Sequence, residues 1–123
     1  MKILKKKGDF NEVVYERLKQ VAKEKTLIAY SKLNEDCKLG LDFNIEEDRR
    51  ELTDILGTIA WREVSMGRPM LSAVVVWKSV RPYTPADGFF AYADELGLRQ
   101  PGEEDRALWY RLLNACYEKW KDA

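Results

Sequence analysis

Two carboxylates and a lysine flank an apolar segment in the middle of the chain, and metal-dependent nucleases use these residue types. Glu63 precedes the segment at residues 70–77, Lys78 follows it directly, and Asp87 comes after a proline-containing loop. Such enzymes hold Mg²⁺ with a few carboxylates and usually place a lysine beside a strand. Residues 72–77 contain no carboxylate, so Asp87 would have to complete the site from its loop. A small Mg²⁺-dependent nuclease, or another phosphate-processing enzyme, is therefore an alternative function and not the preferred one.

A second set of side chains could bind a partner or a small anion. Its members lie at the two ends of the 70–77 segment, in the loop that follows, or at the start of a predicted helix over 45–66. Loops beyond strand ends often carry function, and tryptophan and arginine contribute strongly to interfaces. The candidate binding residues are Arg49, Arg50, Arg68, Trp77, Lys78, Arg81 and Asp87. A nucleotide-like anion bound at Arg68 and the 82–88 loop is a further alternative.

The chain has no histidine and only two cysteines, Cys37 and Cys116, which excludes several kinds of chemistry. Without histidine there is no Ser–His or Cys–His nucleophile pair and no imidazole metal ligand. Two cysteines cannot complete a Cys/His zinc site. We therefore expect no cofactor and no resident metal, and we favour binding over catalysis.

Apolar periodicity and helix-boundary residues predict a mostly helical α+β fold with a small sheet. The predicted helices cover about residues 9–25, 31–38, 45–66 and 88–96 and a C-terminal segment from about 103, with Asp9, Ser31 and Asn44 as N-terminal caps. Residues 26–30 form a short strand or continue the first helix. The three consecutive valines in 70–77 predict the main strand, covered on both faces. We expect one domain over residues 1–123, in which 1–8 are a basic N-terminal lead.

Residues 63–90 resemble a family of small uncharacterised bacterial and phage proteins. The resemblance rests on Gly67-Arg68-Pro69, on the Leu-Ser-Ala-Val-Val run at 71–75, and on the Pro-x-x-Gly-Phe-Phe helix start at 85–90. It covers about a third of the chain together with the aromatic-rich C-terminal helix. It implies a shared fold, and it supplies no activity, cofactor or catalytic residue.

A weaker resemblance, to winged-helix domains, lies at residues 26–41, where a short strand with Thr and Tyr feeds a helix that ends in a Gly-containing turn. It implies a winged-helix variant with 45–66 as the DNA-recognition helix. That helix begins with Glu46, Glu47 and Asp48, which phosphate would repel, and only Arg49 and Arg50 suit DNA. A winged helix used for protein contact is therefore as good a hypothesis as one used for DNA.

The charge balance and the apolar runs complete the prediction. The chain has 21 basic and 21 acidic residues, which gives no overall bias toward a polyanion. No apolar run approaches the length of a membrane helix, so we expect a cytoplasmic protein that does not contact membrane. The preferred function is a non-enzymatic binding protein of bacterial or phage origin, acting as a regulator or inhibitor through a protein or nucleic-acid partner. The choice between these partners and the oligomeric state stay open.

Overall fold

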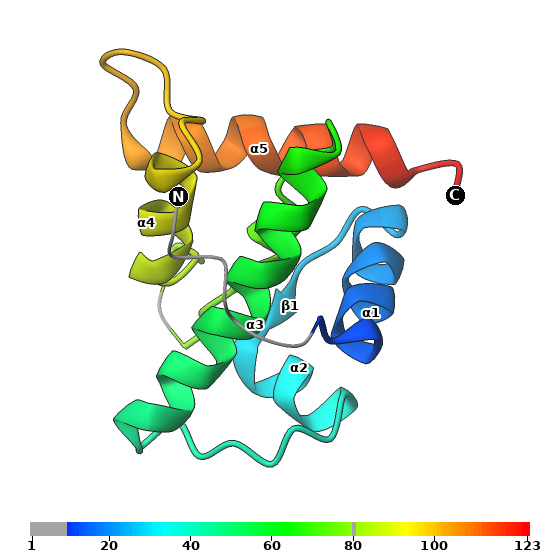
Figure 1. Ribbon diagram of the computed structural model, residues 1–123, viewed down its shortest axis with the longest axis vertical. Helices are drawn as coiled ribbons and strands as arrows, with labels where there is room; N and C mark the ends of the chain where they lie inside the picture. Colours follow the sequence, from blue (N-terminus) through cyan, green and yellow to red (C-terminus); the bar gives the residue numbers. More distant parts are fainter. Residues whose placement is uncertain (1–9, 80) are drawn as a thin grey trace.

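The computed structural model describes residues 10–79 and 81–123, which form five helices, one 3₁₀ turn and two short strands (Figure 1). In chain order these are α1 (Glu12–Lys23), β1 (Ile28–Ala29), α2 (Tyr30–Asp36), α3 (Glu46–Ser65), the 3₁₀ turn η1 (Leu71–Val74), β2 (Val75–Val76), α4 (Asp87–Glu95) and α5 (Asp105–Trp120). The prediction of a mostly helical α+β fold with a small sheet is confirmed. The predicted basic lead at 1–8 and the predicted cap at Asp9 lie outside the described residues.

The helices begin one to three residues away from the positions that the sequence indicated. The cap of α1 is Asn11, whose side-chain oxygen accepts a hydrogen bond from the Val14 N–H at 3.0 Å. Ser31 is not a cap, because α2 already begins at Tyr30, directly after β1. Asn44 is not the cap of α3 either. It lies in a tight turn in which its own N–H donates to the Asp42 side chain at 2.9 Å, and the helix starts after Ile45.

The prediction of a long strand over 70–77 is wrong for most of its length. Only Val75–Val76 are a strand, and they pair in parallel with β1 in the register Ile28↔Val75 and Ala29↔Val76. The preceding carbonyls are bound by side chains of α5 instead of a strand: the Trp109 indole donates to the Ala73 carbonyl at 2.8 Å. The Cys116 thiol donates to the Met70 carbonyl at 3.2 Å. β1 is only two residues long and has no backbone groups beside these carbonyls, so residues 71–74 form the 3₁₀ turn η1.

The segment 70–76 is the centre of the core. Every residue in it is buried, and η1 packs against α1, α3 and α5 at once. Enclosure on several sides explains why this stretch reads as a continuous apolar run and not an alternating one. Figure 1 shows α5 along one edge of the molecule and α4 and α1 on opposite sides of α3. The order of helix, strand, two helices and strand that the winged-helix resemblance implies is present, and its two strands pair in parallel. Membership of the winged-helix fold stays a prediction.

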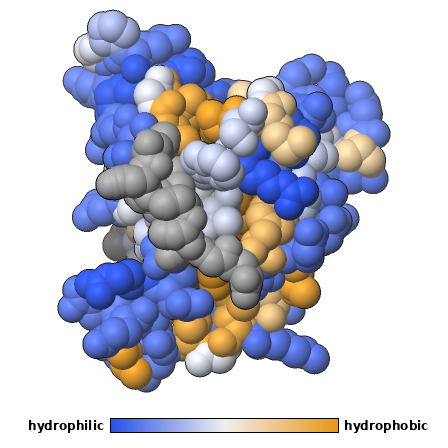
Figure 2. All heavy atoms as spheres, viewed as in Figure 1, coloured by the Kyte–Doolittle hydropathy of each residue, from blue (hydrophilic) through white to orange (hydrophobic). Residues whose placement is uncertain are grey.

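The face shown in Figure 2 is dominated by hydrophilic residues, and apolar residues reach it in separate patches. In the part of the chain that the structure describes, no helix combines the length and the apolar character needed to cross a membrane.

Candidate ligand pocket

A pocket of about 590 Å³ opens where the first turns of α3, α4 and α5 meet the end of β2. This volume lies in the range of small-molecule sites. The lining elements converge on the α4 side of the molecule (Figure 1). Five aromatic side chains contribute to the lining: Tyr30, Phe43, Trp77, Phe90 and Trp109.

The aromatic wall follows from the strand register. Because Ala29 pairs with Val76, the next residues on the two strands, Tyr30 and Trp77, emerge side by side. Their ring centroids are 4.4 Å apart, and Phe43 meets Trp77 edge-on at 6.3 Å. Aromatic pairs of this geometry are favourable beyond the area that they bury. Side chains from three separate parts of the chain thus form one aromatic wall.

Tyr30 also connects this wall to α4. Its hydroxyl oxygen accepts a hydrogen bond from the N–H of Ala86, the residue before α4, at 2.8 Å. Burial raises the pKa of Tyr30 to about 12, so the hydroxyl keeps its proton at neutral pH. The tyrosine therefore fixes the start of α4 against the aromatic wall.

Two of the three arginines that have no carboxylate partner among the described residues line the pocket. The chain has nine arginines, and six of them form ion pairs with Asp or Glu. Among the described residues, only Arg49, Arg81 and Arg106 have no such pair. Arg49 and Arg106 line the pocket. Arg81 lies over the ring of Tyr83, with 5.0 Å between guanidinium and ring centroid.

Neutral oxygens hold these guanidinium groups in place. Arg49 donates to the Phe43 carbonyl at 2.6 Å, and Arg106 donates to the Tyr83 carbonyl at 2.9 Å and the Tyr110 hydroxyl at 3.0 Å. Carbonyl and hydroxyl oxygens orient an arginine without cancelling its charge. The aromatic pocket therefore carries positive charge in fixed positions.

The pocket also contains two aspartates, which differ in their surroundings. Asp105 accepts from Arg99 at 2.8 Å and is therefore neutralised. Asp87 is exposed in the first turn of α4, and no ion pair joins it to another described residue. A carboxylate in a first turn is favoured by the helix dipole. The pocket lining thus contains two arginines and one carboxylate that form no ion pair with another described residue.

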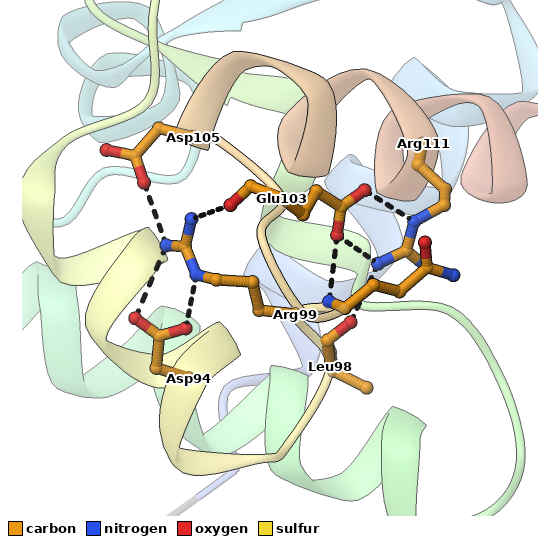
Figure 3. A network of polar contacts seen from close by, with 7 residues as sticks. Asp94, Leu98, Arg99, Glu103, Asp105 and Arg111 are labelled. Atoms are coloured by element: carbon orange, nitrogen blue, oxygen red, sulfur yellow. Dashed lines mark hydrogen bonds and ion pairs between the residues drawn. The ribbon is translucent and has the colours of Figure 1, made fainter.

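A polar network behind the pocket positions the first turn of α5 (Figure 3). Arg99 bridges Asp94 at the end of α4 (2.7 Å) and Asp105 at the start of α5, and it donates to the Glu103 carbonyl at 2.9 Å. Arg111 holds the Glu103 carboxylate with two bonds of 2.7 and 2.9 Å. Arg111, with help from the Gln100 N–H, lowers the pKa of Glu103 to about 2. These contacts fix the 96–104 loop, and with it the position of Arg106.

The structure does not bring the proposed nuclease residues together. Glu63 is fully buried near the end of α3, where both of its oxygens accept from Arg68 at 2.9 Å. It lies about 21 Å along the helix axis from Arg49, at 1.5 Å per residue. Lys78 is exposed beyond β2, 5.6 Å from the Tyr83 ring centroid. Within the described residues, no group of three or more His, Cys, Asp or Glu side chains could hold a metal ion.

The candidate binding residues are divided in the same way. Arg49, Trp77 and Asp87 line the pocket, whereas Arg81 and Lys78 do not line it and lie near the ring of Tyr83. Arg68 is engaged with Glu63, and Arg50 is paired with Glu46 at 3.0 Å on the helix surface. Tyr30 and Arg106 are among the pocket residues that the sequence did not single out. The sequence predicted Tyr30 as the end of a short strand and Arg106 as part of the acidic start of the C-terminal helix. Neither residue had a local sequence feature that indicated a binding role.

Comparisons of the chain with protein-family models, with curated proteins and with solved structures find no match.

Proposed function

We propose that the protein binds a small anion that carries an aromatic ring, the chemical class to which nucleotides belong. The observation that carries this proposal is the coincidence of the aromatic pocket with the arginines that lack a carboxylate partner among the described residues. An aromatic ring of the ligand stacks against the aromatic wall of Tyr30, Phe43 and Trp77. Its anionic group is bound by Arg49 and Arg106.

Charge and shape both support this assignment over an uncharged apolar ligand. Six arginines elsewhere are neutralised by carboxylates, so the two in the pocket stand out as available charges. Guanidinium groups match carboxylate and phosphate oxygens in geometry and can also stack on rings. Arg106 already lies over Trp109 and Tyr110, at 5.2 and 5.3 Å from their ring centroids.

A calorimetric titration tests the proposal with four probes: phenyl phosphate, 1-naphthyl phosphate, inorganic phosphate and neutral phenol. The ring-bearing phosphates are expected to bind more tightly than either inorganic phosphate or phenol. If neither ring-bearing phosphate binds more tightly than inorganic phosphate, the proposal is wrong.

Adjacent arginines on α3 provide a matched pair of variants. Arg49→Gln removes a pocket charge and is expected to weaken binding of 1-naphthyl phosphate about tenfold or more, the usual effect of losing a hydrogen bond to a charged group. Arg50→Gln removes the same charge one residue away, outside the pocket, and is expected to change affinity less than about twofold at moderate salt. Equal losses in the two variants would mean that only the general field of the protein attracts the anion.

A regulator or inhibitor that acts through a protein or nucleic-acid partner stays a prediction. The described contacts carry no observation specific to such a partner, whereas the volume and lining of the pocket favour a small ligand.

A further inference from the structure

Asp87 lines the ligand pocket, yet a ligand whose only charge is negative offers it no partner. The residue is exposed, and no ion pair joins it to another described residue. The other aspartate of the lining, Asp105, is already neutralised by Arg99 at 2.8 Å. Because an unpaired carboxylate repels an anion bound nearby, the charges of the pocket suit a ligand that also carries a positive group.

The packing of α4 on α3 places Asp87 close to the part of α3 that carries Arg49. The next residue, Gly88, lies against α3, where an added Cβ would come within 2.8 Å of the Thr53 methyl group. Thr53 is one turn beyond Arg49 and donates its hydroxyl to the Arg49 carbonyl at 3.1 Å. On the other side of Asp87, the Ala86 N–H is held by a tyrosine hydroxyl at 2.8 Å. The backbone around the carboxylate is therefore fixed on both sides.

The opposite charges of the pocket do not neutralise each other. Arg49 donates to the Phe43 carbonyl at 2.6 Å, and no ion pair joins it to Asp87. Arg106 is held by the Tyr83 carbonyl at 2.9 Å in the same way. The pocket thus presents two positive groups and one negative group in separate positions beside an aromatic wall. Charges arranged in this way are complementary to a molecule that carries both signs itself.

We infer that Asp87 binds an ammonium group, so that the ligand is an aromatic α-amino acid. This inference rests on the proposed function, which supplies the ring and the anionic group, and it adds a positive group to them. The ring lies on the aromatic wall, the carboxylate is bound by Arg49 and Arg106, and the ammonium group is bound by Asp87. An aromatic α-amino acid carries all three groups on a short skeleton, and its size suits a pocket of about 590 Å³.

Calorimetric titration of matched acids tests the inference. L-phenylalanine is compared with 3-phenylpropionate, which lacks only the ammonium group, and with 3-phenyllactate, which has a hydroxyl in its place. The corresponding tyrosine and tryptophan series are titrated in the same way. At least one amino acid is expected to bind about threefold or more tightly than its deaminated acid, the effect of one hydrogen-bonded ion pair at a partly exposed site.

The other outcomes of this titration separate the inference from the proposed function. If no amino acid binds more tightly than its deaminated acid, the inference fails, and the proposed function stands as long as the deaminated acids or 1-naphthyl phosphate bind. If no ring-bearing anion binds at all, the proposed function itself has failed. If a hydroxy acid binds as tightly as its amino acid, the carboxylate recognises a hydroxyl, and the assignment of an ammonium group is overturned.

The variant Asp87→Asn separates recognition of the ammonium group from damage to the pocket. It keeps the shape of the side chain and removes its charge, so the amino acid is expected to bind about threefold or more weakly. The deaminated acid is expected to bind equally well or more tightly, because a like charge has been removed from its surroundings. Thermal unfolding of the variant checks that the fold persists. An equal loss for both ligands would overturn the assignment of Asp87.

Glu47 provides the matched control for this variant. It lies in the first turn of α3, two residues before Arg49, and does not line the pocket. Glu47→Gln removes the same charge and is expected to leave the ratio of the two affinities unchanged. A ratio that falls as far as it does in Asp87→Asn would mean that the general field of the protein selects the ligand, and it would overturn the inference.

Discussion

The ion pair between Glu63 and Arg68 should be strongly asymmetric in its effect on stability. Glu63 is completely buried, whereas the Arg68 side chain retains 22% exposure. The pair is bidentate, with both contacts at 2.9 Å. Removing one partner of a buried pair costs about 3–5 kcal/mol, because the other charge is left unpaired in the interior.

The partner that remains decides the magnitude. In Arg68→Met the carboxylate of Glu63 has no access to water, so we expect the full loss of about 3–5 kcal/mol in the free energy of unfolding. In Glu63→Gln the arginine can turn toward solvent, and the glutamine still accepts one of its bonds, so we expect a smaller loss of about 1–3 kcal/mol. The double variant Glu63→Met with Arg68→Met leaves no charge behind and should be more stable than Arg68→Met alone.

Urea unfolding followed by tryptophan fluorescence measures these differences, and an unchanged m-value shows that the unfolded state is comparable among the variants. Arg50→Met, which breaks an exposed pair with Glu46, is the matched control and should cost less than about 1 kcal/mol. The reasoning is refuted if Arg68→Met costs less than Glu63→Gln, or no more than Arg50→Met. Either result would mean that water reaches Glu63 in the folded protein.

Three further predictions concern other contacts. A Cβ at Gly57 would overlap the Tyr92 ring, so Gly57→Ala should lower the free energy of unfolding by about 1–3 kcal/mol. The loss should be smaller in a Tyr92→Leu background, and equal losses in the two backgrounds would contradict the packing explanation. Arg111 lowers the pKa of Glu103 to about 2, so the stability contributed by that carboxylate is present above its ordinary pKa and is lost as the pH falls from about 4.5 to 2. Arg111→Gln should therefore make Tm less dependent on pH in this acidic range. An unchanged dependence would refute this. Burial raises the pKa of Tyr30 to about 12, so its stabilising contribution is complete below pH 10 and is lost between pH 10 and 12. The pKa of Tyr92 is also raised to about 12, so the absorbance of tyrosinate should show one fewer late-ionising group in Tyr30→Phe than in the parent protein, and an equal number would refute this.

Local patterns in the sequence predicted the helices well and the sheet poorly. The helix over Glu46–Ser65 has acidic residues at its start and a glycine and a proline beyond its end, and it forms within one residue of the predicted bounds. The run of three valines shows that residues 74–76 are buried, and they are, but burial on all sides suits a strand and a tightly packed turn equally. The choice between strand and turn depends on the length of β1 and on the hydrogen bonds that Trp109 and Cys116 of α5 donate to this segment. Both depend on tertiary structure and cannot be read from the local sequence.

The same distinction explains which parts of the pocket could be found from the sequence. Arg49, Trp77 and Asp87 carry residue-type signals that stand out locally, whereas the significance of Arg106 depends on what the other arginines do. Arg68 looked equally available in the sequence, yet it is engaged with a carboxylate five residues away, and Arg106 is held by a carbonyl and a hydroxyl. Residue type alone cannot tell these two arginines apart. The availability of a charge is set by its neighbours in space, and among the described residues Arg49 and Arg106 are the arginines that line the pocket without a carboxylate partner.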